Sequence, residues 1–95
     1  METITPIVHI NGTSGDVLAE AYERATNALH DALEALCEAC PNGRDYYPLG
    51  PDAFGRAQKQ HEERVTKLRA TLSELAMIRE SIADQVDRRA AGRGR

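Results

Sequence analysis

The sequence predicts an all-α fold, in which a long antiparallel two-helix hairpin with an extended N-terminal arm packs into a homo-oligomeric helical bundle. Two long segments repeat apolar residues at helical spacing, and only a short segment rich in Pro and Gly separates them. The 95 residues include no Trp and one Phe, so a hairpin has few large side chains for a core of its own. Small domains are marginal alone, and further copies are therefore expected to cover it.

Residues 1–12 are predicted to form the N-terminal arm. β-branched residues and a proline favour extended chain there, and Asn11-Gly12 signals a turn. Thr13 follows the turn and has the side chain of an N-cap residue, with Asp16 in the acidic position three residues later. We therefore expect Thr13 to cap the first helix.

The first helix is predicted over residues 15–39. Its apolar seam advances by alternate steps of four and three residues, which is the spacing of a helix packed along a partner. The seam residues are Leu18, Tyr22, Ala25, Leu29, Ala32, Leu36 and Ala39. The helix should end before Pro41, because a proline disfavours helical backbone at the residue preceding it.

Residues 41–50 are predicted to form a loop, residues 51–88 a second helix, and residues 89–95 a flexible basic tail. A loop this short makes the helices antiparallel neighbours, so the hairpin spans residues 13–88. The second seam is Phe54, Ala57, His61, Val65, Leu68, Leu72, Leu75, Ile78, Ile82 and Val86. The second helix is the longer one, and we expect the arm or a neighbouring subunit to cover its last seam residues.

Charge and composition exclude several classes of function. The net charge of −3 argues against a partner that is a nucleic acid polymer, since such a partner needs a basic surface. Residues 1–50 carry eight acids and two bases, and residues 51–95 carry seven acids and ten bases, so the halves differ in sign. No apolar run suits a membrane span or a secretion signal. We therefore expect a cytoplasmic protein without a membrane partner.

A first group of candidate binding residues precedes the first helix: His9, Asn11, Gly12, Thr13 and Ser14. It brings backbone N–H groups, two hydroxyls, an amide and an imidazole to a helix start, where anions are favoured. An ordinary turn and helix cap would explain Gly12 and Thr13 equally well. Asp16 would oppose an anion if its carboxylate pointed the same way.

A second group lies in the predicted loop: Gly43, Arg44, Asp45, Tyr46 and Tyr47. Arginine offers a planar fork that fits phosphate, and tyrosine rings stack on bases. The alternative is that the two tyrosines simply close the open end of the hairpin over Leu36 and Phe54.

Two polar residues interrupt the seams, namely Tyr22 on the first helix and His61 on the second. A polar group on a packed seam needs a partner, which could be core, another subunit or a ligand. Cys37 and Cys40 form a lone C-x-x-C at the wrong end of a helix for a redox thiol. We expect neither a metal site nor a cofactor.

The two groups cannot meet within one hairpin. They are separated by the first helix, roughly 35–40 Å at 1.5 Å per residue. Two hairpins packed antiparallel would place the loop of each beside the helix start of the other. A ligand shared by both groups would therefore lie between subunits.

These segments resemble a group of small uncharacterised phage proteins with the motifs H-x-N-G-T-S and G-R-D-Y-Y. The resemblance spans about residues 9–82 and includes Tyr22, His61 and Arg64. In size and helical layout the chain also resembles the phage sponges that counter CBASS and Thoeris immunity. Those proteins oligomerise and sequester cyclic nucleotides or related signals between subunits.

The resemblance implies that the matched residues hold a nucleotide-like small molecule in the host cytoplasm. Arg44 would clamp a phosphate, and Tyr46 or Tyr47 would stack on a base. Thr13 and Ser14 would hold a second phosphate, while His61 and Arg64 would close the pocket. Two alternatives stay open: a protein-interaction module such as an adaptor or inhibitor of a host protein, and a phosphoesterase that uses His61 and Asp45. The absence of an activated nucleophile disfavours an enzyme.

Overall fold

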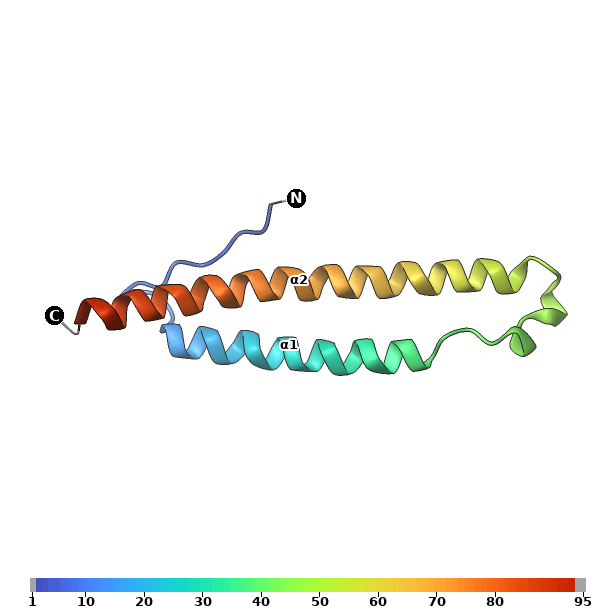
Figure 1. The fold of residues 1–95 in the computed structure, drawn as a ribbon, viewed down its shortest axis with the longest axis horizontal. Coiled ribbons are helices and arrows are strands. Elements are labelled where there is room, and N and C mark those ends of the chain that lie inside the picture. Colours follow the sequence, from blue (N-terminus) through green and yellow to red (C-terminus); the bar gives the residue numbers. More distant parts are fainter. Residues whose placement is uncertain (1, 94–95) are drawn as a thin grey trace.

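A computed structural model describes residues 2–93 of the chain as two long helices packed side by side and antiparallel (Figure 1). Helix α1 spans Gly15–Glu38 and α2 spans Ala53–Arg93, with the short 3₁₀ turns η1 (Gly43–Asp45) and η2 (Tyr47–Leu49) between them. No strand occurs among the described residues. The chain measures 69 × 24 × 20 Å, so the predicted helical hairpin is confirmed as an elongated rod.

Helix α1 begins at Gly15, as predicted, but its N-cap lies one residue after the predicted cap. Ser14 is the N-cap residue, because its backbone is extended and its hydroxyl accepts a hydrogen bond from the N–H of Val17 at 3.3 Å. Thr13 is exposed and lies one position before the cap. The predicted cap at Thr13 is therefore wrong, although both residues have a hydroxyl that suits the role.

The face of α1 that packs on α2 also differs from the predicted seam. Leu18, Tyr22, Leu29 and Leu36 are half-buried as expected, and Leu33 and the buried Thr26 join them. The predicted seam residues Ala25, Ala32 and Ala39 are exposed. The contact follows the bulky side chains, because leucine buries more apolar area than alanine does.

Helix α2 packs with the predicted seam. Each of its ten predicted residues, from Phe54 to Val86, is half-buried or buried, and Ile82 has no exposure at all. The two helices are in close contact at Gly15, where an added Cβ would lie 2.5 Å from Cγ2 of Val86. The helix continues to Arg93, so residues 89–93 extend it beyond the predicted end. Residues 94–95 of the predicted tail lie outside the described part.

The connection between the helices covers residues 39–52. Asn42 caps η1, since its Oδ1 accepts a hydrogen bond from the N–H of Arg44 at 3.0 Å. Gly50 follows η2 with φ of 109°, a backbone conformation that only glycine adopts easily. The half-buried Tyr46 ring lies 6.4 Å from that of Phe54, so it covers the first turn of α2.

The N-terminal segment, residues 2–12, runs back along α2 without regular secondary structure (Figure 1). Gln85 holds it: its Oε1 accepts from the N–H of Val8 at 2.7 Å, and its Nε2 donates to the carbonyl of Pro6 at 2.9 Å. The isoleucines of the segment nonetheless face solvent, with Ile4 89%, Ile7 69% and Ile10 90% exposed.

Candidate functional site

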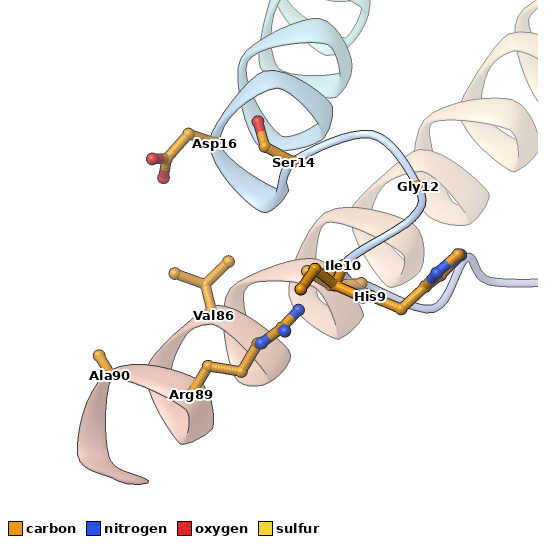
Figure 2. A pocket seen from close by; sticks show the side chains of 9 residues that line it. His9, Ile10, Gly12, Ser14, Asp16, Val86, Arg89 and Ala90 are labelled. Atoms are coloured by element: carbon orange, nitrogen blue, oxygen red, sulfur yellow. The ribbon is translucent and has the colours of Figure 1, made fainter. Parts of the chain in front are cut away.

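Three segments of the chain meet at the end of the hairpin where α1 begins. The N-terminal segment, the first turn of α1 and the last turns of α2 enclose a hollow of about 360 Å³ (Figure 2). We call it the corner pocket. Its lining residues are Val8, His9, Ile10, Gly12, Ser14, Asp16, Val86, Arg89 and Ala90.

A tight turn places the imidazole in this corner. The N–H of Gly12 donates to the carbonyl of His9 at 3.1 Å, which folds the chain back before α1 begins. The ring of His9 lies over Gly12, where an added Cβ would be 2.8 Å from Nε2. The absence of a side chain at Gly12 therefore gives the imidazole its position.

Charges of both signs line the corner pocket. The guanidinium of Arg89 extends from α2 toward the turn that carries His9 and Ile10 (Figure 2). The N-terminal N–H groups of α1 add partial positive charge. Asp16, in the first turn of α1, supplies a negative charge on the other side of the hollow (Figure 2). Arg89 and the helix start can attract an anion, and Asp16 weakens that attraction.

The structure brings His9, Gly12 and Ser14 of the first predicted group into the corner pocket. Asn11 and Thr13 belong to the same turn but do not line the hollow, and both are exposed. Tyr22 lies about two turns into α1, half-buried on the seam that faces α2.

Sequence reasoning missed Arg89, because it placed this residue in a flexible tail. The signal that could have found it is the apolar spacing at the end of α2. Ala90 follows Val86 by four residues, so the helical repeat continues past the expected boundary. A helix extended by one turn carries Arg89 to the start of α1.

The second predicted group lies at the opposite end of the hairpin (Figure 1). Arg44 and Asp45 are exposed in η1, Gly43 is half-buried, and Tyr47 is 77% exposed in η2. Tyr46 packs on Phe54, as the closing role of the tyrosines predicts, whereas Tyr47 is left available for another partner. His61 is half-buried and Arg64 exposed on α2, about two turns and three turns after Phe54.

One chain therefore keeps the two groups apart. Helix α1 has 24 residues, which corresponds to roughly 36 Å between the corner pocket and the beginning of the loop. No side chain bridges such a distance, so the residues predicted to share a ligand do so only if a second chain supplies one of the groups.

The cysteines and acidic residues form no further centre. Cys37 and Cys40 are free and exposed. Among residues 2–93, no three His, Cys, Asp or Glu side chains are grouped so that they could hold a metal ion.

Within the same residues, no helix combines the length and the apolarity that crossing a membrane requires.

Comparison with known proteins identifies no relative: no family model, no curated protein and no solved structure matches the chain.

Proposed function

We propose that the protein is a non-enzymatic, homo-oligomeric binding protein that sequesters a phosphate-bearing, nucleotide-like small molecule in pockets between subunits. The observation that supports this proposal is the corner pocket, where Arg89, His9 and the start of α1 line one hollow. Arginine and a helix N-terminus both favour phosphate, and a neutral or protonated imidazole donates a hydrogen bond to it.

The corner pocket offers groups that would bind the phosphate of a nucleotide, but none that would stack on its base. Its lining contains no aromatic ring besides the imidazole. Tyr47 is exposed at the other end of the hairpin, in the segment that carries Arg44. A second copy packed antiparallel would add a stacking ring and a second cation to the corner, and a nucleotide needs both.

The resemblance to phage sponges supports a signalling molecule as the ligand, namely a cyclic oligonucleotide or an ADP-ribose derivative. Sequestering such a molecule lowers its free concentration without any chemical step. In a host cell this would counter immune signalling in the cytoplasm.

Thermal unfolding with cyclic dinucleotides, cyclic trinucleotides and ADP-ribose derivatives tests the proposal. A ligand at 100 times its dissociation constant should stabilise the protein by about 2.7 kcal/mol, which raises the melting temperature by several degrees. Titration calorimetry should then give one ligand per pocket, and chromatography should recover the ligand unchanged. No stabilisation by any of these ligands at millimolar concentration would contradict the proposal.

Variants of the corner and the loop sharpen the test. Arg89→Ala and Arg44→Ala should each weaken binding about tenfold or more, because each removes a charge-assisted contact to phosphate. Asp16→Asn should strengthen it, since a negative charge leaves the pocket. Arg69→Ala, an exposed arginine halfway along the hairpin, is the matched control and should bind as the unaltered protein does.

The second candidate function is a protein-interaction module that inhibits or links host proteins. The exposed isoleucines of the N-terminal segment, Ile4, Ile7 and Ile10, favour it, because large apolar side chains left exposed on one short segment can dock on another protein. A stoichiometric host protein captured by the unaltered chain, and lost with Ile4→Ser and Ile7→Ser, would favour this function over ligand binding.

A further inference from the structure

Helix α1 carries a second apolar face that α2 does not cover. Six alanines on it are exposed: Ala21, Ala25, Ala28, Ala32, Ala35 and Ala39. Their spacing of four, three, four, three and four residues makes one continuous stripe, which we call the alanine face. At 100° per residue, this stripe lies about 80° round the helix from the leucines that contact α2.

The apolar surface of α1 is wider than a hairpin uses. The leucine seam and the alanine face together span about 160°, whereas a helix that covers one core needs a stripe of about 100°. The alanine face contains no charged residue along the length of α1. A helix with two adjacent apolar faces is typical of a bundle with more than two helices.

The exposed area of the chain is large enough to accommodate a partner. A compact protein of 10.5 kDa exposes about 5400 Å², whereas this chain exposes 7462 Å². The excess of about 2000 Å² exceeds the ~800 Å² that each partner buries in a specific interface of standard size. Its elongated shape and few buried side chains, mainly Ile78 and Ile82, cause that excess.

Charged residues border the alanine face, and their arrangement favours a second, antiparallel copy of the chain as its partner. Arg24 and Asp31 are exposed, seven residues apart, on the edge of the face that lies away from α2. In two antiparallel copies related by a two-fold axis near residues 27 and 28, Arg24 lies opposite the partner's Asp31. Symmetry makes the same pair a second time.

We propose that two copies of the protein pack their α1 helices antiparallel along the alanine face, in the register that pairs Arg24 with the partner's Asp31. The small side chains let the two helix axes approach to about 8 Å, the short end of the range for packed helices. The four helices of the dimer then form one bundle with a shared apolar interior.

This register joins the two halves of the candidate site. Each residue of α1 faces the partner residue near 55 minus its own number, so the end of α1 near residue 40 comes level with the partner's Gly15, at the corner. The loop of one copy then lies at the corner pocket of the other, twice in the dimer. This link to a ligand rests on the proposed function, but the interface itself can be tested without one.

Sedimentation equilibrium of the full chain, without ligand, tests the interface. The unaltered protein should have the mass of a dimer or of a multiple of it. Ala28→Glu places a carboxylate next to the two-fold axis and should raise the dissociation constant about 100-fold or more. Ala70→Glu is the matched control, because Ala70 is an exposed alanine on the side of α2 opposite α1, and its mass should not change.

Charge reversal tests the register with less risk to folding. Arg24→Glu and Asp31→Arg should each raise the dissociation constant about tenfold, because two attractive pairs become repulsive. The double variant restores both pairs with opposite polarity and should dissociate as the unaltered protein does. Circular dichroism should show the same helix content in all variants.

Three results would overturn the interface. The first is a chain that stays monomeric at 100 times the protein concentration of the ligand-binding assay, and the second is an Ala28→Glu variant with unchanged mass. The third is a double charge reversal in which the losses of affinity of the two single variants add. A dimer that behaves as expected but binds no nucleotide would overturn the proposed function alone. A monomer that binds a nucleotide would overturn the interface and the placement of the pocket between subunits, but not the binding of a nucleotide.

Discussion

The two ends of the hairpin are built in different ways. At the corner, three segments of the chain pack together: Gly15 lies against Val86, Ile82 is completely buried, and Gln85 bonds the N-terminal segment. At the loop end, only two segments meet, and packing depends on the contact between Tyr46 and Phe54.

The single chain gains its stability at the corner and leaves side chains available to a partner at the loop. Side chains at the corner are held by neighbours from distant parts of the sequence. Val8 and Gln85, for example, are 77 positions apart in the sequence. At the loop, Tyr47 and Leu49 are 77% and 72% exposed and have little to hold them. We expect substitutions at the corner to cost more stability than equivalent ones at the loop.

Ile82→Ala should have the largest effect. The side chain has no exposure, so its truncation leaves a cavity and should lower the free energy of unfolding by about 2–4 kcal/mol. Urea denaturation at one fixed protein concentration measures the loss. Ile4→Ala is the control, because Ile4 is 89% exposed, and it should change stability by less than about 0.5 kcal/mol. Equal losses would mean that the corner is not the core.

Gly15→Ala should be the next most destabilising change. The new methyl would lie 2.5 Å from Cγ2 of Val86, so the helices would have to separate, at a cost of about 1–3 kcal/mol. Gly55→Ala, in the first turns of α2, meets nothing within 4 Å and should instead gain about 0.5–1 kcal/mol. Melting temperatures of the two variants should therefore move in opposite directions, and a gain for both would contradict the close approach.

Tyr46→Ala tests the loop end. The half-buried ring packs on Phe54, and its loss should cost about 1–2 kcal/mol. Tyr47→Ala should cost less than about 0.5 kcal/mol in the free protein, because its ring is 77% exposed. In a ligand-binding assay the order of the two effects should reverse. Tyr47→Ala should weaken binding more than Tyr46→Ala, because only Tyr47 is available to stack on a base. Equal effects in both assays would remove this distinction.

Gln85→Ala should have the smallest effect of these four changes. It removes the hydrogen bonds to Val8 and Pro6, which together contribute about 1 kcal/mol at a half-buried site. Amide hydrogen exchange should show the Val8 N–H exchanging about fivefold faster, while the amides in the middle of α2 keep their rates. Gln58→Ala, an exposed residue near the loop end, should leave Val8 unchanged.

The helices and the loop between them could be predicted from the sequence because these features depend on local spacing. The repeat of apolar residues located α2 to within a few residues at each end, and the prolines and glycines located the loop. The choice of N-cap was wrong by one residue, since Thr13 and Ser14 have equivalent hydroxyls and the cap is decided by where the chain turns.

The packed face of α1 and the composition of the corner could not be predicted, because both depend on contacts between distant segments. A helix with two adjacent apolar faces offers more than one seam, and the leucines rather than Ala25 and Ala32 meet α2. Arg89 reaches the corner only because α2 continues past residue 88. His9, Gly12 and Ser14 line the corner because they lie in the turn and at the helix start that the local sequence indicates, although the predicted cap was Thr13.

The hydrogen bonds from Gln85 to the N-terminal segment affect how the outward-facing residues of that segment can change. Besides a hydrogen bond to the Ser81 hydroxyl on α2, the amide side chain bonds the segment through peptide groups alone, the N–H of Val8 and the carbonyl of Pro6. Such anchoring is indifferent to the identity of the outward side chains at positions 4, 7 and 10. Sequence drift or deliberate redesign at these three positions could thus alter what the segment touches while leaving its attachment to the rod intact.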